Sequence, residues 1–424
     1  MRNIELLVHG FIGIEVIMEK VETVIVGAGQ AGLSTSYYLK QRGREHLVLE
    51  QTDKVGGAWR NDRWDSFTLL TPNWTIKLPG AHYAGDDPDG FMPRAEIIAY
   101  FENYVEKFAL PVQYGTSVTE VTQLENGSGY QVTTNDKTFH AKNVVMATGQ
   151  FQKPKIPAFS TNIPANILQL HSGKYRNPGQ IPDGAVLVVG SGQSGTQIAE
   201  ELYQSGRTVY VCVGSAPRVP RQYRGRDAFA WLVDIGFTDR TVDKLPSPKA
   251  KFAGNPHLSG KNGGHSINLH LFARDGVKLL GHLVGAEAGK IKLAPDLKES
   301  LAKVDKAETD ITALIDQFIE KNGVNAPQEV LPMYQDGYAL EEITELDLQT
   351  ANIHTVIWAM GYKFDYSLVK LPVTDADGYP LQQRGVTHYP GLYFIGMSWL
   401  YKHKSPLLLG VGEDAEYIVT HMTQ

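Results

Sequence analysis

The chain has 424 residues, of which 42% are hydrophobic and 20% are charged, as in a globular protein large enough for two domains. Its formal net charge of −6 excludes a general electrostatic attraction to nucleic acid. The single cysteine, Cys212, excludes an internal disulfide and any Cys-x-x-Cys redox pair. No apolar run is long enough to cross a bilayer, so we expect a cytoplasmic protein with neither a membrane nor a nucleic-acid partner.

The N-terminal residues do not have the pattern of a signal peptide. Charged or polar residues interrupt the apolar stretch at Glu5, His9 and Glu15, and no small-residue cleavage site follows. Met18 begins a short lead into the first expected strand. We therefore expect Met18 to be the natural start and residues 1–17 to be an upstream extension.

The first expected unit is a strand, a turn, a helix and a second strand. Residues 21–26 are apolar and rich in β-branched side chains, residues 31–42 have helical periodicity, and residues 47–49 form another apolar run. Residues 112–140 alternate around a glycine-rich turn and predict an antiparallel meander. A buried strand is expected at residues 144–147. This succession predicts the opening of a doubly wound α/β sheet.

A proline-rich stretch, residues 151–182, is expected to connect two domains. The pattern of strand, glycine-rich turn and helix then recurs from residue 185 to about residue 204, and a strand follows at 208–213. The second βαβ unit predicts a second domain of the same kind.

Four further elements are expected in the rest of the chain. Residues 296–322 form a strongly charged helical segment that ends at Asn322-Gly323. Buried strands are expected at 355–359 and 392–395, and a last helix near Gly412.

The first turn, Gly27 to Gly32, is a complete G-x-G-x-x-G motif between a strand and a helix. The first glycine permits a tight turn, the second lets the backbone approach a pyrophosphate, and the third lets the helix pack on the strand. Free N–H groups and the helix dipole then face the anion. Glu50, at the end of the next strand, can accept both ribose hydroxyls. This motif predicts a dinucleotide site.

The second turn, Gly190 to Gly195, has the same context but lacks the acid, because its following strand ends at Gly214-Ser215. Four arginines come next: Arg218, Arg221, Arg224 and Arg226. Guanidinium groups pair with a 2′-phosphate, so this site predicts NADPH rather than NADH, with Arg218 and Arg221 nearest to the phosphate. The alternative is a solvated basic loop.

Several shorter motifs are each compatible with a plain turn. Gly56-Gly57-Ala58-Trp59 suits a chain passing beside a flavin edge. The strand ends at residues 147–149 and 359–361 suit crossings between domains. Gly396 and the glycines before the last helix suit a helix N-terminus directed at the reduced flavin ring.

Taken in order, these motifs resemble the flavin-containing monooxygenase superfamily over roughly residues 18–424. The segments 214–227 and 268–277 resemble a bacterial branch labelled "flavoproteins involved in potassium transport". The resemblance implies an α/β fold with two Rossmann-like domains, of the glutathione-reductase-like FAD/NAD(P) kind, with the NADPH domain inserted in the FAD domain.

Domain bounds follow from this fold. We expect the FAD domain at 18–160 and 340–424, and the NADPH domain at 161–339 with a family-specific insertion at about 218–295. Within the insertion, Trp231, Phe237, Phe252 and Phe272 line either a substrate pocket or an ordinary core.

The cofactor residues are assigned from the motifs together with the resemblance. For FAD they are Gly27, Gly29, Gln30, Ala31, Gly32, Glu50, Gln51, Gly57, Ala58, Trp59, Val118, Ala147, Thr148, Gly149, Gly396 and Gly412. For NADPH they are Gly190, Ser191, Gly192, Gln193, Ser194, Gly195, Arg218, Arg221, Ala359, Met360 and Gly361.

The resemblance implies that FAD, once reduced by NADPH, reacts with O₂ to give a C4a-(hydro)peroxide that oxygenates a small heteroaromatic, amine or sulfur compound. Asn73 is the counterpart of an asparagine that these enzymes place near the flavin, and it also fits a turn after Pro72. The fingerprint Phe-x-Gly-x-x-x-His keeps only His171, since Ala165 and Ile167 replace the other two residues. Baeyer–Villiger chemistry is therefore disfavoured.

Two other functions stay open on the sequence: an NADPH:acceptor reductase without oxygenation, and a nucleotide-sensing regulator. Disulfide reductases need a cysteine pair that this chain lacks. No metal-binding spacing occurs among the histidines, and His171 is expected to bond to backbone rather than to a metal. The oligomeric state is left open, with a homodimer as one option.

Overall fold

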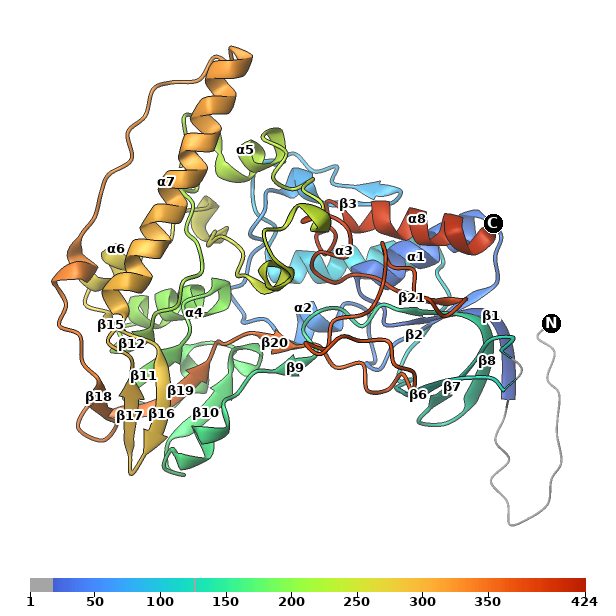
Figure 1. Cartoon of the computed structure of the whole chain (residues 1–424), viewed down its shortest axis with the longest axis horizontal. Coiled ribbons are helices and arrows are strands. Elements are labelled where there is room, and N and C mark those ends of the chain that lie inside the picture. Colours follow the sequence, from blue (N-terminus) through green and yellow to red (C-terminus); the bar gives the residue numbers. More distant parts are fainter. Residues whose placement is uncertain (1–17, 126) are drawn as a thin grey trace.

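The computed structural model describes residues 18–125 and 127–424 (Figure 1). The predicted extension at residues 1–17 lies outside the described residues, which begin at Met18, so the natural start of the chain stays a prediction. The described chain divides between two sheets with parallel strands at their centres, and each sheet carries one of the glycine-rich turns.

The first sheet has the strand order β5-β2-β1-β8-β7-β6, with β21 beside β8. Its strands are β1 (Met18–Val26), β2 (His46–Leu49), β5 (Val112–Gln113), β6 (Val118–Gln123), β7 (Tyr130–Thr134), β8 (Thr138–Met146) and β21 (Leu392–Phe394). β1 pairs in parallel with β2 and β8, whereas β6, β7 and β8 form the predicted antiparallel meander. Three helices, α1 (Gln30–Gln41), α3 (Arg94–Lys107) and α8 (Val411–Thr423), lie together on one side of this sheet (Figure 1).

The second sheet is parallel throughout, in the order β10-β19-β11-β12-β15. Its strands are β10 (Leu168–His171), β11 (Ala185–Val189), β12 (Val209–Cys212), β15 (Lys278–Leu280) and β19 (Ile353–Trp358). α4 (Gln193–Gln204) follows β11, and a small antiparallel sheet of β16 (Leu283–Glu287), β17 (Lys290–Leu293) and β18 (Glu345–Asp347) lies beside it. Central strands buried on both faces explain the continuous apolar runs in the sequence.

The chain crosses between the sheets twice, and the two crossings pair with each other. β9 (Lys153–Pro154) and β20 (Tyr362–Lys363) form an antiparallel ribbon between the two halves of the molecule (Figure 1). The predicted return at residue 340 is wrong, because β19 lies in the middle of the second sheet. The return crossing therefore comes only after Trp358.

The predicted insertion also needs correction, because β15 completes the second sheet and falls inside the bounds 218–295. What projects beyond the sheet is built from α5 (Ala228–Asp234) and α7 (Leu297–Asn322), whose apolar faces meet around Trp231 and Ile315. α7 matches the predicted charged helix, and Gly323 ends it with a φ of 62°. Trp231 and Phe272 are core residues, whereas Phe252 is exposed.

The remaining elements are short. They are α2 (Gly57–Asn61), α6 (Leu269–Arg274), the hairpin of β3 (Lys77–Leu78) and β4 (Ala81–His82), and the pair β13 (Gln222–Tyr223) and β14 (Arg226–Asp227). Among the helices of the described residues, none has the length and apolar character needed to cross a bilayer. The predicted α/β fold, with two sheets and one unit inserted in the other, is confirmed.

Candidate functional site: two glycine-rich turns

At the first turn, helix α1 approaches β1 so closely that only glycine fits. A Cβ added at Gly32 would lie 2.0 Å from the carbonyl oxygen of Gly27, and one at Gly27 would lie 2.7 Å from that of Ala147. Gly27 also has a φ of 107°, which L side chains rarely adopt. Its N–H donates to the Leu49 carbonyl at 2.8 Å, so the turn is tied to β2.

Gly29 differs from its neighbours because a Cβ there would meet nothing within 4 Å. It is the N-cap of α1, and no side chain caps the helix. The first backbone N–H groups of α1 are therefore free to bind an anion, where the helix dipole adds to the attraction. An open glycine at an uncapped helix start fits the pyrophosphate of a dinucleotide.

Glu50 is buried next to this turn and is held in place by hydrogen bonds. The Ala28 N–H donates to its Oε2 at 2.8 Å, and the Thr52 N–H and hydroxyl donate to its Oε1 at 3.0 and 2.8 Å. Oε2 keeps acceptor capacity for a ribose hydroxyl. Thr52 is not predicted from the sequence. The only feature that could have indicated it is its position two residues after Glu50.

The second turn repeats the first in detail. A Cβ at Gly195 would lie 1.9 Å from the Gly190 carbonyl oxygen, and one at Gly190 would lie 2.7 Å from that of Ala359. Gly190 has a φ of 106°, and its N–H donates to the Cys212 carbonyl at 3.1 Å. Gly192, like Gly29, is the uncapped start of its helix and faces open space. This turn fits a second dinucleotide.

Gln30 and Gln193 occupy equivalent places in the two turns. Each side chain hydrogen-bonds to a segment that is distant in sequence and lies next to its turn. Gln30 donates its amide to the Pro406 carbonyl, in the segment before α8. Gln193 donates to the Leu258 carbonyl and accepts from the Leu258 N–H at 3.0 Å. Their side-chain amides are thus engaged within the protein, which leaves only their backbone N–H groups available to a dinucleotide.

The second site has a buried valine where the first has Glu50. The Glu50 N–H donates to the Gln113 carbonyl on β5, and the Val213 N–H donates to the Leu280 carbonyl on β15, each at 2.9 Å. Val213 is fully buried. A carboxylate that would repel a 2′-phosphate is therefore absent from this position.

Arg218 and Arg221 do not fit the role predicted for them. Arg218 donates to both Glu308 oxygens, at 2.9 and 2.7 Å, and to Asp305 at 2.8 Å, and only 4% of it is exposed. Arg221 pairs with Asp227 at 2.5 Å and donates to the Leu70 carbonyl, with 1% exposed. Both guanidinium groups are paired with carboxylates inside the protein, so neither is free to bind a 2′-phosphate.

The side chain of Asn73 is also occupied by hydrogen bonds within the fold. Its amide nitrogen donates to the Asp87 carbonyl at 2.9 Å, and its oxygen accepts from the Met92 N–H at 2.7 Å. These bonds close the loop between residues 73 and 92. The structure thus favours the alternative of a turn residue over a catalytic one.

The other predicted FAD residues gather partly around the first turn. Gly57 opens α2 beside the acid, since a Cβ there would lie 3.8 Å from Glu50 Oε1. A Cβ added at Gly396 would lie 2.6 Å from the Ala31 Cβ, so Gly396 packs directly on Ala31. Trp59 is half-buried against Phe67 and Phe101.

The remaining predicted residues lie at the margins. Gln51 and Ala58 are exposed, Val118 and Thr148 are half-buried, and Gly412 lies in the first turn of α8. Met360 is 41% exposed at the return crossing.

His171 bonds to backbone, as predicted. Its Nε2 lies 3.1 Å from the Gly361 carbonyl oxygen, and its Nδ1 accepts from the Gly173 N–H at 3.2 Å. Its ring also meets Tyr362 edge-on, at 4.6 Å between centroids. His171 thus joins the second domain to the return crossing. Within the described part of the chain, no cluster of three His, Cys, Asp or Glu side chains could hold a metal.

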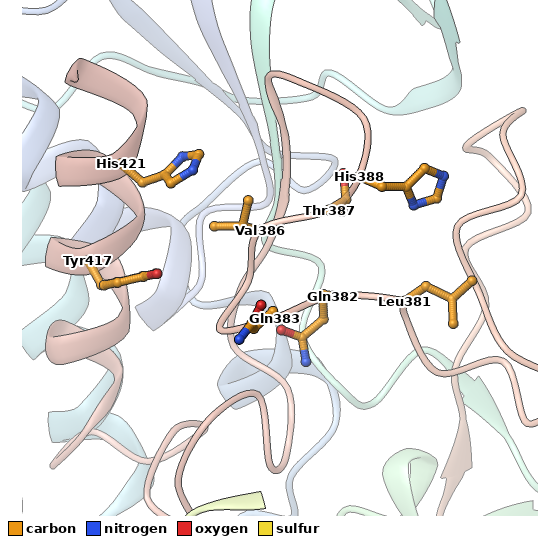
Figure 2. A pocket seen from close by; sticks show the side chains of 8 residues that line it. All are labelled: Leu381, Gln382, Gln383, Val386, Thr387, His388, Tyr417 and His421. Carbon is orange, nitrogen blue, oxygen red and sulfur yellow. The ribbon is translucent and has the colours of Figure 1, made fainter. Parts of the chain in front are cut away.

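An open hollow of about 520 Å³ lies away from both turns, between α8 and residues 381–388 (Figure 2). Tyr417 and His421 come from the helix, and His388 points away from them on the opposite segment (Figure 2). None of its lining residues was predicted to bind a cofactor. The hollow therefore does not mark the dinucleotide site.

Comparison with known proteins places the chain among oxidoreductases. A family model described as pyridine nucleotide-disulphide oxidoreductase matches residues 24–227. The chain is 34% identical over 401 residues, 94% of its length and 97% of the relative's, to a protein of Geobacillus kaustophilus named uncharacterized oxidoreductase CzcO-like. It is 27% identical to the indole-3-pyruvate monooxygenase YUCCA6 of Arabidopsis thaliana, over 76% of this chain and 82% of that one.

Among solved structures, the fold is similar to that of a flavin-containing monooxygenase from Stenotrophomonas maltophilia. The TM-score is 0.66 at 21% identity, over 95% of this chain and 98% of that one. These likenesses confirm the predicted resemblance to the flavin-containing monooxygenase superfamily and the predicted fold.

We expect Arg218→Ala to cost about 3–5 kcal/mol of unfolding free energy, because it leaves the mostly buried Glu308 carboxylate without its partner and removes one of the donors to Asp305. Although burial opposes it, hydrogen bonds from His270 and Tyr338 and the charge of Arg218 lower the pKa of Asp305 to about 2. Urea unfolding measures the loss. Lys306→Ala, which breaks an exposed pair with Asp310 on the same helix, is the control and should cost less than about 1 kcal/mol. Normal stability with weakened NADP⁺ binding in Arg218→Ala would restore the original assignment.

Two glycine variants separate folding from binding at the second turn. Gly195→Ala should fail to fold, because its methyl group would meet the Gly190 carbonyl. Gly192→Ala should keep the wild-type melting temperature and lose NADP⁺ binding, since its methyl group would occupy the open space at the start of α4. Thermal unfolding and isothermal titration calorimetry check both. Equal NADP⁺ affinity in Gly192→Ala would contradict the site.

Asp414 should make stability depend on pH. It is 2% exposed, and burial raises its pKa from 3.8 to about 6, against the lowering effects of Ser405 and Arg384. Folding then retains a proton that the unfolded chain releases, so stability falls as pH rises from about 4 to about 6, by up to about 3 kcal/mol. Asp414→Asn should be more stable than wild type at pH 7 and not at pH 4, measured by urea unfolding. Glu416→Gln, at an exposed position two residues further along α8, should show no such difference.

Proposed function

Because this chain belongs to the family of the CzcO-like oxidoreductases, we propose that it is an FAD-dependent, NADPH-consuming monooxygenase. It inserts one oxygen atom from O₂ into a small heteroaromatic, amine or sulfur compound. The observation that carries the proposal is the pair of equivalent glycine turns, one on each sheet, at helix starts that no side chain caps.

The first turn is assigned to FAD and the second to NADPH. Glu50 supports FAD, because its carboxylate suits an unphosphorylated ribose. Val213 supports NADPH, because the equivalent position carries no charge that would repel a 2′-phosphate. When bound, FAD takes a hydride from NADPH and activates O₂ for transfer of one oxygen atom.

The protein's own residues bind, position and shield. The N–H groups of α1 and α4 bind the two pyrophosphates. The segments that Gln30 and Gln193 hold lie over the turns, which reduces the access of water. No acid–base pair is required from the chain, because the cofactors carry the chemistry.

The single cysteine argues against a disulfide reductase. Cys212 ends β12 inside the second domain, and burial raises the pKa of its thiol to about 12. A buried thiol with that pKa is not a nucleophile near neutral pH. The chain has no other cysteine.

Isotope labelling tests oxygen insertion. The FAD-loaded full chain, supplied with NADPH and ¹⁸O₂, is given an indole, a tertiary amine and a thioether in turn. We expect one ¹⁸O atom in at least one product by mass spectrometry, with NADPH and O₂ consumed in equal amounts. A parallel reaction in H₂¹⁸O with ordinary O₂ should leave the product unlabelled.

Steady NADPH oxidation with label only in peroxide and water, for all three compounds, would contradict the proposal and favour an NADPH:acceptor reductase. A flavin that stays oxidised under anaerobic NADPH would contradict both functions and favour a nucleotide-sensing protein. Gly192→Ala is the matched control, since it should retain FAD and lose NADPH oxidation.

A further inference from the structure

To distinguish NADPH from NADH, the second dinucleotide site needs a group that contacts the 2′ position of the ribose. Arg218 and Arg221 are paired inside the insertion, and Val213 occupies the position that corresponds to Glu50. Another strand end at the same edge of the second sheet is a further place from which a side chain can reach this ribose. β12 and β15 are neighbours there, with Cys212 opposite Leu280.

His282 lies at that edge. It follows β15 by two residues, just as Gly214 follows β12 by two residues. A Cβ at Gly214 would lie 3.9 Å from His282 Nε2 and 3.9 Å from the Ser191 hydroxyl oxygen. The imidazole thus stands beside the second glycine turn, in the crevice outside the carboxyl ends of parallel strands where such folds bind ligands.

Asp296 fixes the orientation of this imidazole. The His282 N–H donates to Asp296 Oδ1 at 2.9 Å, and His282 Nδ1 lies 2.7 Å from Oδ2. Because an ionised carboxylate only accepts, Nδ1 must carry a proton, and Nε2 is the atom left to face Gly214. The His282 side chain is 49% exposed, so a ligand can reach it.

The start of a long helix lies beside this imidazole. Asp296 is the N-cap of α7, a helix of 26 residues, so His282 lies at the positive end of a long helix dipole. Asp296 holds the ring with Nε2 toward Gly214, where Nε2 can hydrogen-bond to a phosphate oxygen. Ser191 is already engaged, because its hydroxyl accepts from the Gly214 N–H at 2.8 Å.

We propose that His282, positioned by Asp296, binds the 2′-phosphate of NADPH and sets the preference for NADPH over NADH. The inference rests on the proposed function, in which the second turn holds the nicotinamide dinucleotide. It assigns to a histidine and an aspartate the role that the sequence suggested for two arginines.

Binding to the FAD-loaded full chain tests this without turnover. The probes are NADP⁺, NAD⁺, 2′,5′-ADP and 5′-AMP, titrated by isothermal calorimetry. Wild-type protein should bind the two phosphorylated probes more tightly than their partners. His282→Ala should weaken NADP⁺ and 2′,5′-ADP about tenfold, because a charge-assisted hydrogen bond is lost, and leave NAD⁺ and 5′-AMP within about twofold.

Three further variants separate recognition from structure. His282→Arg should keep the preference for NADP⁺, since a guanidinium group also pairs with phosphate. Asp296→Asn should reduce the preference less than His282→Ala does. His354→Ala should change nothing, because His354 lies near the start of β19, where its Nδ1 meets the Asp183 carbonyl.

The outcomes distinguish this inference from the proposed function. Equal weakening of NADP⁺ and NAD⁺ in His282→Ala, unchanged NADP⁺ affinity, or wild-type protein without preference for NADP⁺ would each overturn the inference and leave the oxygenase proposal standing. Wild-type protein that binds neither dinucleotide would overturn the proposed function, and the inference with it. The inference would be established by three results together: a tenfold loss of NADP⁺ affinity alone in His282→Ala, a retained preference for NADP⁺ in His282→Arg, and normal binding in His354→Ala.

Discussion

The contact between a glycine and a carbonyl oxygen, made once in each sheet, is the constraint on which the site depends. At Gly32 and at Gly195 a helix sits so close to its preceding turn that even a methyl group would overlap the backbone. This close packing places the start of each helix at the edge of its sheet. The residue at each helix start is a glycine, so no side chain covers the first N–H groups of the helix. Each sheet thereby presents backbone N–H groups that can bind an anion. Side chains then differentiate the two sites, with Glu50 at one and Val213 at the other.

The insertion stabilises this arrangement by burying charge. Three arginines, Arg218, Arg221 and Arg224, pair with carboxylates at the base of the insertion and along α7. Buried guanidinium groups are tolerated only when they are paired and hydrogen-bonded, so these contacts fix where the insertion sits more than they add to stability. The same insertion reaches back over the second turn, where Leu258 bonds to Gln193. The binding edge and the covering segment are thus parts of one packed unit.

The glycine turns, the strands around them, the long charged helix and Glu50 could be predicted from the sequence, because each depends on residues close together in the chain. The roles of Arg218 and Asn73 could not. The partners of Arg218 lie on α7, about 90 residues later, and a basic run has the same sequence pattern whether it is solvated or buried. The sequence also does not predict where the chain returns to the first sheet, because no local signal says which sheet a strand such as β19 joins. His282 and Asp296 belong to no motif, and only the register of β12 with β15 brings the imidazole to the second turn.

The position of β19 has a consequence for biosynthesis. This strand fills the centre of the second sheet, between β10 and β11, and comes from residues 353–358. β21, which completes the first sheet beside β8, comes later still. As the ribosome releases the polypeptide from its N-terminus, both sheets have exposed strand edges until residues 353–394 have been translated. The nascent chain therefore cannot finish one domain before starting the other, and a truncated product lacks the middle of one sheet and a flank of the other.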